Sequence, residues 1–129
     1  INCRIIPGIE PTAIKAQLAT IINNPDIEIT SVWDTIWSSP SNLDLVLSDI
    51  EQITTQMWPG VIVMPVMSTG GTDGTFLRAE GIPTFGVSGI FTDVDDNRQH
   101  GRDERIGIKQ YYEAQEFMYR LVKKIGGNP

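Results

Sequence analysis

The sequence is poor in the residues from which metal sites and disulfides are built. It has one cysteine, Cys3, and one histidine, His100, among 129 residues. A single cysteine cannot form an internal disulfide, so the fold does not depend on an oxidising compartment, and the compartment itself stays open. A zinc site needs at least three protein ligands, and Cys3 is distant from His100 in sequence. If His100 binds zinc, most of that site lies outside this chain.

The chain also lacks a basic excess and a long apolar run. Its net charge is −6, whereas binding to nucleic acid without sequence preference depends on neutralising phosphates with a basic face. The best candidate for a membrane span, residues 61–67, is followed by the polar stretch 68–71. That run falls far short of the roughly 20 residues that cross a bilayer. We therefore expect neither nucleic-acid binding nor membrane insertion.

What the chain does have is enough apolar material for one globular core. Two fifths of its residues (40%) are hydrophobic, which suits an ordinary domain of this length. The sequence begins at Ile1 and not at methionine, and residues 1–6 have the character of a strand already under way. No targeting segment precedes them. We therefore expect the chain to be a fragment.

Strand-like and helical segments alternate along the sequence. The opening unit is predicted as strand, helix and strand, with Pro11 at the start of the helix. A stretch rich in Ser, Pro and Asn, residues 34–45, is the best candidate for a linker between domains. Ser48 and Glu51 have the spacing of a capping box for the next helix, which Pro59 and Gly60 end.

The second part repeats this alternation. An apolar strand, a glycine-rich turn, a short helix capped by Gly81, a further strand, a polar loop and an amphipathic closing helix follow in order. This order predicts an α/β fold with functional loops at the carboxyl ends of its strands. The predicted strands are 1–6, 27–31, 61–67 and 83–91, and the later helices are 75–80 and about 111–125.

His100 lies in the polar segment DDNRQHGRDER, residues 95–105, directly after the last predicted strand. Neutral imidazole is the commonest transition-metal ligand, and α/β proteins place their chemistry in such loops. Two plainer interpretations stay open. The histidine can be an exposed residue without a role, and the acids and arginines around it can form a solvated ion-pair mesh of little net stability.

The acidic residues of this loop offer a competing prediction. Asp93, Asp95, Asn97 and Glu104 fall at positions one, three, five and twelve of a calcium-loop pattern. Position six, where that loop turns sharply on a glycine, is Arg98. The segment before Asp93 is also strand-like and not helical. Calcium binding is therefore the weaker alternative.

Two further features bear on ligand binding. Residues 68–74 form a glycine-rich turn before a helix, which can expose backbone N–H groups to an anion, although a plain strand-to-helix turn explains it nearly as well. Arg4 interrupts an otherwise apolar strand. An arginine on the inner face of a strand is costly unless it is paired, but Arg4 can equally face solvent.

Three stretches together resemble the carboxyl-terminal part of the dizinc aminoacylase and carboxypeptidase family, which includes carboxypeptidase G and succinyl-diaminopimelate desuccinylase. They are INCRIIPG (1–8), STGGTDGTFLRAEGIPTFG (68–86) and HGRDERI (100–106). The resemblance implies a zinc-binding α/β catalytic domain interrupted by a ferredoxin-like lid that often dimerises. It makes residues 1–37 the last part of the lid and residues 38–129 the end of the catalytic domain.

The resemblance also implies roles for individual residues. His100 matches the family's last metal ligand, which completes the coordination of one of two zinc ions. Arg4 matches a lid arginine that grips the substrate carboxylate, a task suited to a planar guanidinium. Gly70, Gly71 and Thr72 match the loop that lines the substrate pocket with backbone N–H groups. Asn97 lies close to an asparagine that some relatives use, with its register left open.

The family's other metal ligands and its general-base glutamate are absent from this chain. We therefore expect the chain to be inactive alone and to work with an amino-terminal part of the same protein. The resemblance implies a zinc metallopeptidase or amidohydrolase that cleaves a small peptide or an N-acyl amino acid next to a free carboxylate, with a possible homodimer through the lid. The alternative is a non-catalytic fragment or binding module.

Overall fold

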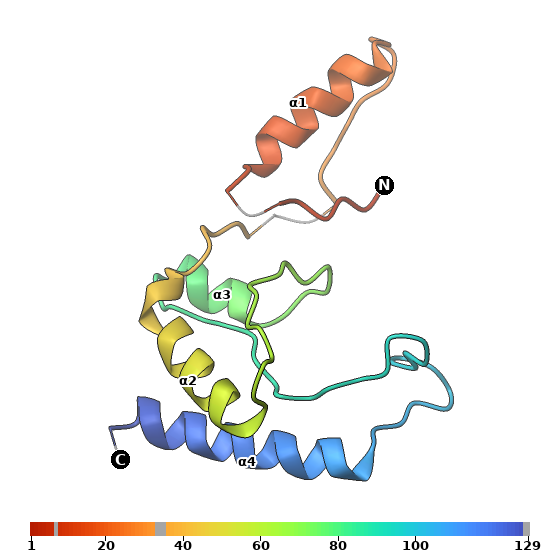
Figure 1. Cartoon of the computed structure of the whole chain (residues 1–129). Coiled ribbons are helices and arrows are strands. Elements are labelled where there is room, and N and C mark those ends of the chain that lie inside the picture. Colours follow the sequence, from red (N-terminus) through yellow and green to blue (C-terminus); the bar gives the residue numbers. More distant parts are fainter. Residues whose placement is uncertain (7, 33–35, 128–129) are drawn as a thin grey trace. The chain divides into compact units, whose positions relative to one another are not determined.

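The computed structural model describes residues 1–6, 8–32 and 36–127 (Figure 1). Within these ranges the regular structure is helical. None of the described helices is both long and apolar enough to span a bilayer. The helices are α1 (Pro11–Ile22), the 3-10 helix η1 (Leu43–Leu45), α2 (Leu47–Met57), α3 (Gly74–Ala79) and α4 (Ile108–Ile125).

The chain divides into two compact units, each made of two separate stretches of sequence. The first unit is Ile1–Asn42 with Pro65–Phe85 and contains α1 and α3. The second unit is Leu43–Met64 with Gly86–Pro129 and contains η1, α2 and α4. The expected division into residues 1–37 and 38–129 stays a prediction, and the start of the expected linker, at residues 34 and 35, lies outside the described residues.

The predicted helix in the first 25 residues is confirmed as α1. Pro11 occupies its first turn, where the missing N–H of proline would have had no partner in the helix. The helix ends at Asn23, whose backbone is left-handed (φ 45°) and whose N–H donates to the Ala19 carbonyl at 3.0 Å. Asparagine tolerates this conformation better than most residues, so the local sequence both starts and stops α1.

The predicted short helix is confirmed as α3, and Gly81 terminates it as expected. Gly81 has a positive φ of 78° and donates its N–H to the Arg78 carbonyl at 3.0 Å. The N–H of Ile82 reaches back to the Leu77 carbonyl, also at 3.0 Å. This pair of hydrogen bonds is the Schellman arrangement, which needs a left-handed residue and therefore favours glycine.

The core of the second unit lies between α2 and α4 (Figure 1). At one edge, Lys124 of α4 donates to the Gln52 side chain at 2.6 Å and pairs with Asp49 of α2 at 3.6 Å. The predicted capping box is wrong, because the helix begins after Val46 without a side-chain cap, which places Ser48 inside α2. The buried apolar residues are Val46, Ile50, Ile53, Ala114, Phe117 and Leu121.

The α/β prediction is wrong for the described residues, and the lid-like strand–helix–strand unit expected in residues 1–37 shows only its helix. The segments 1–6, 27–31, 61–67 and 83–91 contain no strand. The physical reason is that a strand exists only where a second strand completes its hydrogen-bonded ladder, and an apolar pattern does not specify that neighbour. Side chains expected in a sheet interior are consequently exposed, such as Ile62 at 87% and Val66 at 78%.

Candidate functional site

The loop that carries His100 is anchored at both ends in the second unit. At its start, the Phe91 ring packs edge-on against Trp58, with ring centroids 4.8 Å apart. Trp58 in turn contacts Phe117 of α4, with centroids 5.6 Å apart. At its end, the loop runs into the first residue of α4, Ile108. Residues 92–107 between these anchors have no helix or strand, so turns and side chains must fix their conformation.

His100 sits on the turn at the middle of this loop with an exposed side chain and a left-handed backbone, φ 62°. Few residues other than glycine adopt this conformation, and histidine is among those enriched in it. The turn is closed by the N–H of Gly101, which donates to the Arg98 carbonyl at 3.0 Å. The N–H of Glu104 then donates to the Gly101 carbonyl at 3.3 Å. The loop therefore presents the imidazole outward.

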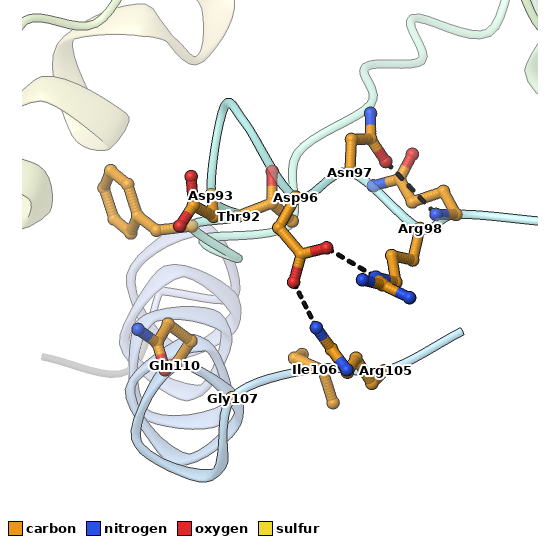
Figure 2. A pocket seen from close by; sticks show the side chains of 11 residues that line it. Thr92, Asp93, Asp96, Asn97, Arg98, Arg105, Ile106, Gly107 and Gln110 are labelled. Atoms are coloured by element: carbon orange, nitrogen blue, oxygen red, sulfur yellow. Dashed lines mark hydrogen bonds and ion pairs between the residues drawn. The ribbon is translucent and has the colours of Figure 1, made fainter. Parts of the chain in front are cut away.

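Four charged side chains brace the loop, and we call them the Asp96 network: Asp96, Arg98, Asp103 and Arg105. The Asp96 carboxylate accepts from Arg98 Nε through one oxygen and from Arg105 Nη2 through the other (Figure 2). Arg98 also donates through Nη1 to Asp103. Hydrogen bonds from Arg105 and Arg98 hold the pKa of the Asp96 carboxyl below its ordinary value of 3.8.

The side chains proposed for calcium are used differently in this loop. The Asp93 carboxylate accepts from the Asp95 backbone N–H at 2.9 Å, and the Asn97 amide oxygen accepts from the Gln99 N–H at 3.1 Å. Both are local turns that satisfy backbone groups. Across the described part of the chain, no three His, Cys, Asp or Glu side chains lie close enough to hold a metal ion. The loop alone therefore assembles neither the calcium pattern nor a complete zinc site.

A pocket of about 260 Å³ opens between the loop and the start of α4 (Figure 2). Two aspartates and two arginines line it together with apolar residues, so its formal charges balance. His100 is not one of its lining residues. The pocket is lined by Phe91, Thr92, Asp93, Asp96, Asn97, Arg98, Gln99, Arg105, Ile106, Gly107 and Gln110.

The donor chemistry of His100 fits one metal ligand and no more. Its imidazole is exposed and makes no side-chain hydrogen bond to another described residue, while the nearby Asp96 and Asp103 carboxylates are taken up by arginines. Zinc takes nitrogen ligands readily but needs at least three protein ligands. A zinc site that included His100 would therefore need further ligands from residues that this loop does not supply.

The other predicted substrate residues belong to the first unit. Arg4 is exposed, and Gly70, Gly71 and Thr72 form an exposed turn just before α3. One of the expected anion-binding groups is engaged locally, because the Gly70 N–H donates to Ser68 Oγ at 3.1 Å. The Thr72 carbonyl accepts from the Thr75 N–H at 3.2 Å as the helix begins. The roles predicted for these four residues stay predictions.

Sequence reasoning missed two features that the structure shows. It recognised charges around His100 but not that Asp96 is the residue that joins two arginines on opposite sides of the histidine. It also missed Ser41, whose hydroxyl donates to the Thr84 carbonyl at 3.2 Å and accepts from the Thr84 N–H at 2.9 Å. For Asp96 the signal was the mixture of acids and arginines in residues 95–105. For Ser41, 43 residues before its partner, the sequence offered none.

Comparisons with known proteins found a matching family model and a similar curated protein. A family model described as peptidase family M20/M25/M40 matches residues 6–124. A protein named "Probable carboxypeptidase S-like 2" from Dictyostelium discoideum is 28% identical over 127 residues, which is 95% of this chain. The chain spans 24% of that relative's length. No solved structure matches the chain.

Proposed function

Because the chain belongs to peptidase family M20/M25/M40, we propose that it is part of a zinc-dependent hydrolase that cleaves an amide or peptide bond next to a free carboxylate. The family is one of peptidases that are generally metal-dependent, and the Dictyostelium relative is named as a carboxypeptidase. The observation that carries the proposal is the exposed His100 imidazole, held outward on a braced turn inside the matched region.

His100 supplies one ligand to the metal in this proposal, and residues outside this chain supply the others. Bound zinc provides Lewis acidity that polarises a carbonyl oxygen. The role of this chain is to hold the His100 imidazole at a fixed position. The loop does this through the left-handed backbone of His100 and the hydrogen bond from the Gly101 N–H to the Arg98 carbonyl, which leave the side chain exposed.

Substrate recognition falls to Arg4 and the turn at Gly70, Gly71 and Thr72. The planar guanidinium of Arg4 matches a carboxylate through two parallel hydrogen bonds and is exposed for that role. The turn offers backbone N–H groups to the scissile group, with Gly71 open on the side where a Cβ would stand. Candidate substrates are small peptides and N-acyl amino acids, and a homodimer through the lid is part of the same proposal.

The carboxylate requirement tests this function directly. In the intact protein, Arg4→Ala should raise KM for an N-acyl amino acid about tenfold or more, because a bidentate charged contact is lost, while kcat changes less. The same acyl amino acid with its carboxylate amidated serves as the control substrate, since Arg4 has nothing to grip on it. Hydrolysis should stop with a chelator and return with zinc.

Two results contradict the proposal. If Arg4→Ala raised KM equally for the free acid and for the amidated substrate, Arg4 would not recognise the carboxylate. Full hydrolysis after zinc has been stripped would exclude a metal-dependent reaction. Lys15→Ala, which removes an exposed cation from α1, is the matched control for a general change in surface charge and should leave both substrates unaffected.

A further inference from the structure

The Asp96 network is a chain of three ion pairs that runs from Asp103 through Arg98 and Asp96 to Arg105, across the loop that carries His100. Asp96 and Arg98 precede His100, and Asp103 and Arg105 follow it. The Asp96 carboxylate uses both oxygens, one for an arginine on each side of His100 (Figure 2). Asp96 therefore joins the two arms of the loop through Arg105, and its partner Arg98 joins them a second time through Asp103.

Asp96 and Arg98 are also the less exposed members of this network. Each has a side chain 36% exposed, whereas Asp103 and Arg105 are 62% and 60% exposed. A carboxylate that accepts through both oxygens from two arginines is more restricted in geometry than one held by a single surface pair. The order of the loop should therefore depend on Asp96 more than on either outer residue.

We infer that Asp96 is the positioning residue of the His100 loop, and that it sets the affinity of the metal site by fixing the direction of the imidazole. This inference rests on the proposed function, because it requires His100 to bind the ion. Asp96 touches neither substrate nor metal in this arrangement. It acts through Arg98 and Arg105, which hold the turn on which the left-handed His100 backbone depends.

The size of the expected effects separates this role from a purely structural one. Exposed ion pairs contribute little to global stability, so removal of the Asp96 charge should shift the melting temperature by less than about 3 °C. Residues that orient a metal ligand typically change metal affinity about tenfold to hundredfold when they are mutated. Metal affinity should therefore change far more than stability.

The experiment compares four forms of the intact protein: wild type, Asp96→Asn, Asp96→Glu and Asp95→Asn. The Asp95 carboxylate is the matched control, because it is a neighbouring acid outside the network. The affinity for zinc is measured by competition with a chromophoric chelator. Hydrogen exchange of residues 96–105, followed by mass spectrometry, reports loop order without reference to activity.

Asp96→Asn should weaken zinc binding about tenfold to hundredfold and speed exchange across the loop, Asp96→Glu should restore part of both, and Asp95→Asn should stay within about twofold of wild type. Wild-type zinc affinity and exchange in Asp96→Asn would overturn the inference. A His100→Asn variant separates the two proposals. If it loses zinc while Asp96→Asn keeps it, only the positioning role fails; if it also keeps its zinc, the proposed function fails.

Discussion

At the scale of single residues, the sequence identified His100 but not what holds it. Its uniqueness and its place in HGRDERI were visible from the amino acids alone. Its left-handed backbone and the bracing by Asp96 were not, because both depend on how a loop without helix or strand closes on itself. Arg98 illustrates the same limit, since its neighbours in sequence offered several acids and only the fold selects Asp96 and Asp103.

The ionisation of Asp96 gives a residue-scale prediction. Hydrogen bonds from Arg105 and Arg98 favour the charged form and outweigh the opposing effect of desolvation, so the folded pKa of Asp96 lies below 3.8. With the folded pKa lowered, the network stabilises the loop fully above about pH 3.8 and loses this contribution as the pH falls through the lower, folded pKa.

An NMR titration of the Asp96 carboxyl carbon measures this pKa in the folded chain. The Asp95 carboxyl carbon, read in the same spectra, is the internal reference for an aspartate outside the network. A pKa for Asp96 at or above 3.8, or one that does not rise in an Arg105→Gln variant, would contradict the network as described.

At the scale of elements, helices were predictable and strands were not. Pro11, Gly81 and the apolar spacing of α4 are local signals, because a helix satisfies its backbone within itself. A strand depends on a partner that can lie anywhere in the sequence. The segments 61–67 and 83–91 have the composition of strands but no ladder among the described residues, so the prediction failed at the step from composition to pairing.

The contact between the segment before the loop and α4 gives an element-scale prediction. Gly89 has a φ of 64°, and a Cβ at this position would stand 2.7 Å from a ring carbon of Phe117. Phe117 is only 3% exposed and cannot move without disturbing the core between α2 and α4. Gly89→Ala should therefore destabilise the protein by about 2–5 kcal/mol through backbone strain and overpacking.

Urea unfolding of Gly89→Ala and Gly86→Ala measures this difference. Gly86 lies in the same segment, has no positive φ and would meet no heavy atom within 4 Å of a Cβ. Its alanine variant should stay within about 1 kcal/mol of wild type. Equal stabilities for the two variants would show that Gly89 does not pack against Phe117 as described.

At the scale of the whole molecule, the chain spans about a quarter (24%) of the length of the relative it matches. The sequence has one histidine, which is too few ligands for a zinc site, and we therefore expect further ligands outside this chain. Among the described residues, no group of three His, Cys, Asp or Glu side chains lies close enough to hold a metal ion, and the expectation that the other ligands lie elsewhere stays a prediction. We therefore propose that the chain contributes one metal ligand, His100, and the loop that positions it.

The zinc content of the intact protein tests this account most directly. His100→Asn is the informative variant, because asparagine tolerates the left-handed backbone and the loop keeps its shape while the imidazole is lost. Gln99→Ala, next to it in the same loop, is the control. Measured by metal analysis after dialysis, wild type and Gln99→Ala should hold about two zinc ions per chain and His100→Asn about one, with most activity lost. Unchanged zinc content and turnover in His100→Asn would contradict the central claim.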